Sequence, residues 1–275
     1  EGKNIFHTMF DAIYKKLTYR QQVKMFTFMG MNKIIGLLLV VLAFSPAGAQ
    51  LKITTIKGIG GTYSEGDSFP VVRSVNQVMA EKINSFLQLE ILENEKVETD
   101  PGKIFRKAAY IYEADSIVQY GLSMIGYEVL LNNPRVLSFK FELESSGAYP
   151  TLYDRYYSFN AQTGEPVAAK DLFTGEGMKY LQTFLRSERA KRIAKHLKEE
   201  HPHTEDSAYL QEAFETCNSE PNEDLLVIQK ESILFYKYGC LPHAYQPMET
   251  DLDVRVSFIQ LKKYLSPAGR KLLGI

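Results

Sequence analysis

Three carboxylates fall close together in the sequence pattern and could perform acid–base chemistry. Glu142 and Glu144 alternate with apolar residues in RVLSFKFELES (135–145), so both fall on the same face of one expected strand. Asp154 follows on the next expected strand. Most glycosidases use a pair of carboxylates that flank the scissile glycosidic bond. A hydrolase that uses Asp154 with Glu142 or Glu144 is therefore one interpretation, and a solvated sheet face without catalytic function is the other.

The sequence after residue 49 lacks the short motifs that mark common hydrolytic sites, since HExxH, GxSxG and SxxK do not occur in it. His201 and His203 are separated by one proline, but no cysteine or carboxylate pair falls at the spacing of a metal site. Nothing in the sequence supplies Cys217 with the histidine and third group that a nucleophile needs. We therefore expect no catalytic residue, no metal site and no cofactor.

Tyrosine is the unusual aromatic residue of this chain, which has 17 Tyr and no Trp. A tyrosine side chain combines a flat apolar ring with a polar hydroxyl, which suits recognition of sugars and proteins. The expected binding residues, drawn from two tyrosine-rich stretches, are Tyr149, Tyr153, Asp154, Arg155, Tyr157 and Tyr245. The alternative is that the tyrosines only cover the edges of a sheet.

A leader sequence is expected before the folded part of the chain. MNKIIGLLLVVLAFSPAGAQ (31–50) has a lysine, then an apolar run, then the small residues Ala-Gly-Ala after a proline. This is the layout of a secretory signal peptide, which we place at 31–49. The apolar run is about half the length that a membrane-spanning helix needs. Residues 1–30 are then an upstream extension outside the mature protein, and an uncleaved N-terminal anchor is the alternative.

Cleavage of such a leader predicts a secreted protein, periplasmic or extracellular, with no permanent membrane span in the mature chain. Removal of residues 1–49 takes away six of the 32 basic and two of the 33 acidic residues, which leaves 26 and 31 and a formal net charge of −5. Nucleic-acid binding depends on neutralising phosphates with basic side chains. The acidic balance therefore argues against a nucleic-acid partner.

Export also affects the interpretation of the two cysteines, because an oxidising compartment favours a disulfide over a metal site. LLVIQ (225–229) and SILFYKY (232–238) predict a hairpin that brings Cys240 back near residues 222–223, a few residues from Cys217. A Cys217–Cys240 disulfide is then within bridging distance. Two free thiols are the alternative if the compartment keeps its thiols reduced.

Three strands are predicted in the middle of the chain, where apolar and polar residues alternate. Their ranges are 124–133, 135–145 and 151–160. In the second strand we expect a buried face that consists of Leu137, Phe139, Phe141 and Leu143, and a polar face that consists of Val136, Ser138, Lys140, Glu142 and Glu144. Gly164 follows in the loop AQTGE, where the hairpin requires a positive φ.

Helices are predicted at 72–93, 176–200 and 207–217, where apolar residues recur at spacings of three and four. A strand at 254–261 and a terminal helix close the chain. Strands cluster and helices are inserted between hairpins, without regular βαβ alternation. This pattern predicts a hairpin-rich α+β fold, with an antiparallel sheet and helices packed on one side.

The helix at 176–200 carries many basic residues outside its apolar stripe. They are Arg186, Arg189, Lys191, Arg192, Lys195 and Lys198. A solvated basic face is the simpler interpretation, and docking of an anionic partner or polymer is the alternative.

Residues 139–173, FKFELESSGAYPTLYDRYYSFNAQTGEPVAAKDLF, resemble a bacterial extracytoplasmic domain of unknown function. That family has a hairpin of the form D-x-x-T-G-x-x-(L/V)-x-x-x-D-L-F. This sequence matches it at Thr163, Gly164, Asp171, Leu172 and Phe173, with Asn160 at the aspartate position. The closing run at 233–267 is similar to the family's last strands and L-x-x-Y-L ending, although Ala148 replaces a frequent histidine upstream.

The run FPVVRSVNQVMAEKINSFLQ (69–88) resembles the partner module that often precedes this domain. The resemblance implies two α+β modules, at 50–150 (similar to the N-terminal module of deacetylases) and at 151–275, which share one sheet. Such a pair stands before the catalytic domain of some peptidoglycan deacetylases. It also forms the extracellular part of a membrane anti-sigma factor that senses lysozyme.

The resemblance therefore implies an exported, non-catalytic binding module of the cell envelope rather than an enzyme. The identity of the ligand does not transfer with the resemblance, and we expect peptidoglycan, another cell-wall glycan, or a protein such as lysozyme. Two alternatives are a hydrolase or deacetylase-like enzyme that acts on envelope polymers, and a structural or assembly factor of the envelope.

Overall fold

The computed structural model describes residues 50–57, 67–92, 97–100, 103–104, 121–146, 151–200, 207–220, 225–237 and 239–275. Residues 50–275 form one compact unit. The expected upstream extension, the signal peptide at 31–49, Tyr149, and the histidines at 201 and 203 lie outside the described residues. In the part of the chain that is described, no helix has the length and apolarity to cross a membrane.

The N-terminal part consists of one hairpin and one helix. Strands β1 (Lys52–Lys57) and β2 (Ser68–Arg73) pair antiparallel, and helix α3 (Gln77–Leu92) follows. The helix was predicted to begin at 72 and instead begins at 77, because residues 68–73 are paired with β1. Its N-terminus is capped by Asn76, whose Oδ1 accepts a hydrogen bond from the backbone N–H of Met79 at 3.2 Å.

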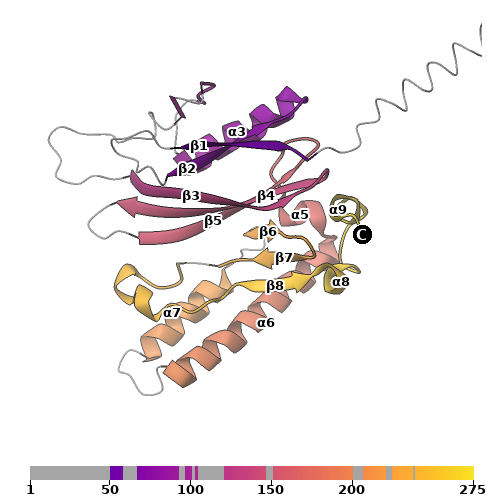
Figure 1. Cartoon of the computed structure of the whole chain (residues 1–275). Helices are drawn as coiled ribbons and strands as arrows, with labels where there is room; N and C mark the ends of the chain where they lie inside the picture. The colour runs from indigo at the N-terminus through magenta and orange to yellow at the C-terminus, as the bar shows by residue number, and fades with distance from the viewer. Residues whose placement is uncertain are drawn as a thin grey trace, which may run out of the picture. The chain divides into compact units, whose positions relative to one another are not determined.

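The three predicted central strands are confirmed. They are β3 (Gly121–Asn132), β4 (Val136–Ser146) and β5 (Thr151–Asn160), paired antiparallel in the order β3-β4-β5. The expected apolar face of β4 is buried and shares a core with helix α3. Figure 1 shows where α3 lies along the chain's N-terminal part. The ring of Phe86 in α3 contacts those of Tyr157 and Phe159 in β5, at centroid distances of 5.3 and 5.4 Å.

The other face of β4 was expected to be solvated, and this is wrong for its first residues. Val136 and Ser138 are 1% and 0% exposed, because the C-terminal part of the chain covers them. The hydroxyls of Ser138 and Ser158 are hydrogen-bonded at 2.8 Å, and Ser158 Oγ accepts from the backbone N–H of Ile228 at 2.8 Å. Only the far end of this face, from Lys140 onward, remains polar and accessible.

The hairpin loop after β5 confirms the predicted role of Gly164. Its φ is +78°, a conformation that a residue with a Cβ adopts only with strain. Its backbone N–H donates to Asn160 O at 2.8 Å. A Cβ added here would lie 2.5 Å from the backbone oxygen of Met79 in α3, so the loop also packs closely against that helix.

The C-terminal part contains a second three-stranded sheet, in the order β6-β7-β8. Its strands are β6 (Leu226–Ile228), β7 (Ser232–Phe235) and β8 (Val254–Ser257). The helical segments are α5 (Ala169–Leu172), α6 (Gly175–Glu200), α7 (Ser207–Ser219), the 3₁₀ helix η1 (His243–Met248), α8 (Phe258–Leu261) and α9 (Pro267–Leu273). Helix α6 shares a core with this sheet, on the side away from β5 in Figure 1.

The last strand was predicted over 254–261 and is shorter than that. It ends at Ser257, whose hydroxyl accepts from the backbone N–H of Gln260 and starts helix α8. The terminal helix is confirmed as α9.

The α+β fold class is confirmed: helices alternate with small antiparallel sheets. Three sheets are present among the described residues. The expected module boundary at 150/151 lies between β4 and β5, which are paired neighbours in the central sheet. Strand β5 is thus the last strand of that sheet and lies next to the C-terminal part.

Candidate functional site

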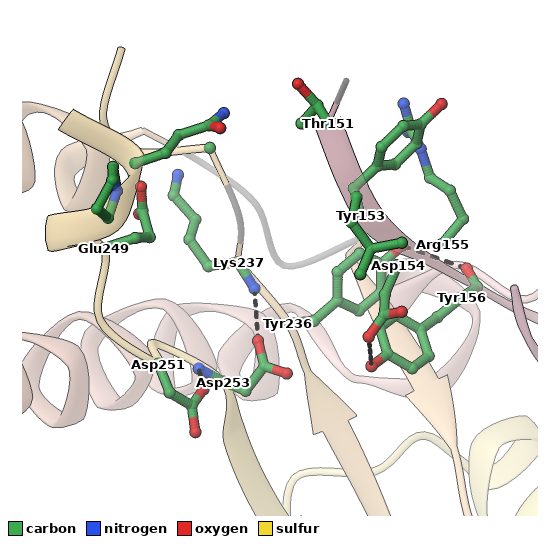
Figure 2. A pocket seen from close by; sticks show the side chains of 14 residues that line it. Thr151, Tyr153, Asp154, Arg155, Tyr156, Tyr236, Lys237, Glu249, Asp251 and Asp253 are labelled. Carbon is green, nitrogen blue, oxygen red and sulfur yellow. Dashed lines mark hydrogen bonds between the residues drawn. The ribbon is translucent and has the colours of Figure 1, made fainter. Parts of the chain in front are cut away.

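A groove of about 900 Å³ runs along β5 and is the candidate site. Residues 151–156 of β5 form one side. The other side is the wall segment, defined here as Tyr236, Lys237 and residues 239–253. The wall segment lines the groove with residues from its beginning, its middle and its end. Figure 2 shows the side chains of the two sides approaching each other across it.

The groove collects three of the six expected binding residues. Tyr153, Asp154 and Arg155 all line it, and Arg155 Cζ lies 5.6 Å from the centre of the Tyr153 ring. A guanidinium over an aromatic face is attracted by the ring quadrupole, so this contact orients both side chains. Consecutive residues of β5 reach the groove because it follows the outer edge of the strand.

The other expected binding residues lie elsewhere. Tyr157 is partly buried in the core beneath β5, with its ring 6.2 Å from that of Phe141. Tyr245 is partly buried in the wall segment and contacts the ring of Tyr209 at 4.8 Å. Neither is among the groove residues, and Tyr149 lies outside the described residues.

Asp154 belongs to an ion cluster on the polar end of the sheet face. Lys140 Nζ lies 2.9 Å from Glu142 Oε1 and 3.1 Å from Asp154 Oδ2. The hydroxyl of Tyr156 donates to the same Asp154 oxygen at 3.1 Å. Burial, together with the charge of Asp154, raises the pKa of Tyr156, so its hydroxyl stays protonated and remains a donor.

Lys140 also remains charged in this cluster. Burial alone would lower its pKa, but the hydrogen bonds to Glu142 and Asp154 outweigh burial and raise it. Of the three carboxylates considered for glycoside hydrolysis, Glu142 and Asp154 are thus direct cross-strand partners that share one ammonium group. Of Glu142, Glu144 and Asp154, only Asp154 lines the groove.

The wall segment is fixed to β5 and to itself by hydrogen bonds that the sequence pattern did not reveal. The hydroxyl of Tyr236 donates to the backbone oxygen of Tyr156 at 3.2 Å, and the two rings lie 4.8 Å apart. Asp253 Oδ1 accepts from the backbone N–H of Lys237 at 3.0 Å. Figure 2 shows Tyr236 beside Asp154 and Tyr156 of β5.

Glu249 joins the two ends of the wall segment. Its carboxylate oxygens accept from the backbone N–H groups of Cys240 at 3.2 Å and Leu241 at 3.1 Å. Burial raises the pKa of Glu249 and that of Asp253, and the backbone hydrogen bonds offset this only in part. Burial also lowers the pKa of Lys237. The charge of Glu220, whose Oε2 lies 3.7 Å from Lys237 Nζ, raises this pKa but does not outweigh burial.

Helix α6 holds the wall segment from behind, through a residue that was expected on a solvated basic face. Arg189 is 1% exposed. Its Nε donates to Leu252 O at 3.1 Å, and its Nη2 donates to Phe235 O and Tyr236 O at 3.3 and 3.4 Å. The assignment of Arg189 to the solvated face is therefore wrong.

A signal for this position exists in the sequence. Arg189 follows Leu181 and Leu185 and precedes Ile193 at intervals of four, so it lies on the buried stripe of α6. His196 continues the same side, and its Nε2 is hydrogen-bonded to Met248 O at 2.9 Å. The other basic residues of α6 lie outside this buried side, and Arg192 pairs with Asp251 at 3.5 Å.

The predicted disulfide is present. Cys217 in α7 is bonded to Cys240 in the wall segment, with an S–S distance of 2.01 Å and a Cα–Cα distance of 5.3 Å. It attaches the wall segment to helix α7. Among the described residues, no group of three or more histidine, cysteine or acidic side chains is arranged to hold a metal ion.

Comparison with solved structures gives a likeness in fold. The crystal structure of a DUF3298 family member from Bacteroides fragilis matches with a TM-score of 0.53 and 13% identity, over 82% of this chain and 94% of that chain. A DUF3298 family protein from Pseudomonas aeruginosa matches with a TM-score of 0.46 and 11% identity, over 80% and 94% of the two chains. No protein-family model and no curated protein sequence matches the chain. The first likeness is one of fold.

Proposed function

We propose that this protein is an exported, non-catalytic binding module of the cell envelope, and that the groove along β5 binds a cell-wall glycan such as peptidoglycan. The leader-like sequence at 31–49 supports export, and so does a disulfide, which forms and persists in oxidising compartments. The resemblance to modules that accompany peptidoglycan deacetylases and a lysozyme-sensing anti-sigma factor supports the envelope as the location.

The observation that carries the proposal is the composition and fixation of the groove. Tyr153, Tyr156 and Tyr236 line it, so aromatic rings and polar groups stand side by side, as recognition of sugar faces and hydroxyls requires. Both sides are held by internal bonds before any ligand arrives. A pre-organised site loses less conformational entropy on binding, which favours affinity.

A basic protein such as lysozyme is the second candidate, and the charge of the groove favours it. Four carboxylates line the groove, those of Asp154, Glu249, Asp251 and Asp253, against the two cations of Arg155 and Lys237. The segment from 50 to 275 is also acidic overall. Complementary charge accelerates association with a basic partner and makes it sensitive to salt.

Retention on insoluble peptidoglycan tests the first candidate. The exported, purified protein should sediment with the polymer, and Tyr153→Ala should release most of it. Tyr180→Ala is the matched control, because Tyr180 is also half-buried but lies on α6, stacked on Tyr264 and outside the groove. Equal retention of both variants would remove the groove from the proposal.

Two further measurements separate the alternatives. Titration with lysozyme at low and high salt tests the basic-protein candidate, which requires binding that weakens as salt rises. Release of sugar, peptide or acetate from peptidoglycan would instead support the hydrolase or deacetylase-like alternative, with Asp154 as the residue to mutate. No binding and no turnover would leave the structural or assembly role.

A further inference from the structure

A second hollow lies beside the disulfide and is lined by helix α7 and the wall segment. It has a volume of about 380 Å³ and is called the disulfide hollow here. Helix α7 supplies Tyr209, Glu212 and Thr216, and the wall segment supplies Cys240 and Pro242. Tyr209 is 42% exposed, and one part of its ring surface is covered by Tyr245, at a centroid distance of 4.8 Å.

Gly239 belongs to both the groove and the disulfide hollow. Its φ is +70°, which glycine adopts without strain. A Cβ built on it would meet no atom of the described residues within 4 Å, its two chain neighbours left aside. The two concave regions therefore share one residue that has no side chain to block a passage between them.

The floor of this passage is held firmly. Cys240, the next residue, is bonded to Cys217 of α7, and its backbone N–H donates to Glu249. The neighbouring N–H of Leu241 donates to the same carboxylate. A fixed floor keeps the distance between the groove and the disulfide hollow constant, which a repeating polymer can match without distortion.

The charges and rings of the combined surface restrict the ligand class. The groove has four carboxylates and two cations, and the disulfide hollow adds Glu212 and Glu220 with no lysine or arginine among its described residues. Polyanions such as nucleic acids are therefore repelled. Both parts of the surface contain an aromatic ring, Tyr153 in the groove and Tyr209 in the disulfide hollow, and rings of this kind pack on the apolar faces of sugars.

We propose that the groove and the disulfide hollow form one extended site for a chain of N-acetylated amino sugars, which carry no charge, and that this chain crosses Gly239 and occupies subsites on both sides. This inference rests on the proposed function, because it assigns the ligand of the same groove. It adds that a single sugar or a disaccharide fills only one side, so affinity increases with the length of the chain.

The test uses linear N-acetylglucosamine oligosaccharides, a disaccharide and a hexasaccharide, with binding to the exported protein measured by calorimetry. The hexasaccharide should bind at least tenfold more tightly than the disaccharide. Thr216→Trp fills the disulfide hollow from the exposed face of α7 and should remove most of this difference while leaving disaccharide binding unchanged. Gln211→Trp, also exposed on α7 but outside the hollow, is the matched control and should bind both like the wild type.

Equal affinity for both lengths, or an unchanged hexasaccharide affinity in Thr216→Trp, would overturn the extended site and leave the groove as a site of its own. Failure of the wild type to bind either oligosaccharide would overturn it as well. In that case retention on insoluble peptidoglycan separates the failure of the extended site from the failure of the proposed function. If the protein is retained, the proposed function stands with another ligand chemistry; if it is not retained, both proposals are overturned. Far-ultraviolet circular dichroism of each variant verifies that the fold is kept.

Discussion

The two sides of the groove are built in different ways. Strand β5 satisfies its backbone through a regular ladder with β4 and packs Phe159 into an aromatic core. The wall segment has no partner strand over most of its described length, and outside the short helix η1 several of its backbone groups are bonded to side chains. Arg189, Glu249 and Asp253 supply such bonds near both of its ends.

This difference shows where the stability of the site resides. Buried backbone groups need partners wherever they lie, and an irregular segment obtains them from a few charged side chains. Arg189 bonds three backbone oxygens, and Glu249 bonds two backbone N–H groups. If one contact of β5 is lost, the neighbouring hydrogen bonds of the ladder still hold the strand. If one of the side chains that bond the wall segment is lost, we expect a whole side of the groove to lose its fixed conformation.

Replacement of Arg189 should have the largest effect. Arg189→Met keeps the length of the side chain but removes the donors to the carbonyls of Leu252, Phe235 and Tyr236. A buried polar group left without a partner costs roughly 1–3 kcal/mol, so the free energy of unfolding should fall by about 4 kcal/mol. Urea denaturation measures it.

Arg186→Met is the matched control for this change. Arg186 lies one turn earlier on the same helix and is exposed, with one bond to the backbone oxygen of Ser219 at 2.8 Å. Its replacement should cost less than about 1 kcal/mol. Comparable losses for the two variants would show that Arg189 does not support the wall segment in the way described.

Removal of the disulfide should have the next largest effect. Cys217→Ser with Cys240→Ser frees a loop closed over a sequence separation of 23. Loop-closure entropy predicts a loss of about 3 kcal/mol in the free energy of unfolding. Hydrogen exchange should show faster exchange in the wall segment and little change in β5. Uniformly faster exchange in both would contradict the separation of the two sides.

The sequence predicted the β5 side of the groove well. Alternation at period two located β3, β4 and β5, and the requirement for positive φ located Gly164, because both signals are local. Tyr153, Asp154 and Arg155 were identified for the same reason, since they lie on a strand whose position was clear.

The wall segment could not be predicted in this way. Its residues obey no period, and the side chains that hold it come from α6 or from its own far end. The charge of Arg189 concealed its place on the buried stripe, and no local pattern indicates that Glu249 reaches Cys240. The disulfide was the exception. The hairpin of β6 and β7 was predictable from the sequence, and it returns the chain so that Cys240 lies near Cys217.

Glu249→Gln should have an intermediate effect. The carboxylate accepts two backbone N–H groups, whereas an amide has one oxygen and would turn a donor toward the other N–H. Because one backbone N–H would be left without an acceptor, we expect the free energy of unfolding to fall by about 2 kcal/mol. Glu212→Gln, in the disulfide hollow and exposed, should be neutral within about 0.5 kcal/mol. An equally neutral Glu249→Gln would mean that the disulfide alone fixes this end of the wall segment.

Asp253→Asn should have the smallest effect and should appear only as a change with pH. Burial raises the pKa of Asp253 above its ordinary value of 3.8, so the folded protein binds this proton more tightly than the unfolded chain does. The contribution of the protonated Asp253 to the free energy of unfolding is fully present below pH 3.8. It is lost as the pH rises through the pKa of Asp253 in the folded protein. Asparagine keeps an oxygen for the N–H of Lys237 but does not titrate.

The difference in the free energy of unfolding between Asp253→Asn and the wild type should therefore shift in favour of the variant as pH rises from about 3.8, and then level off. Urea denaturation over a series of pH values measures this difference, and other carboxylates cancel because both proteins contain them. Asp154→Asn is the counterpart on β5, where the carboxylate is paired with Lys140 and bonded to Tyr156. Its replacement removes a favourable ion pair, so that variant should be less stable than the wild type at neutral pH. A difference between Asp253→Asn and the wild type that stays constant over the pH series would contradict the role given to burial of Asp253.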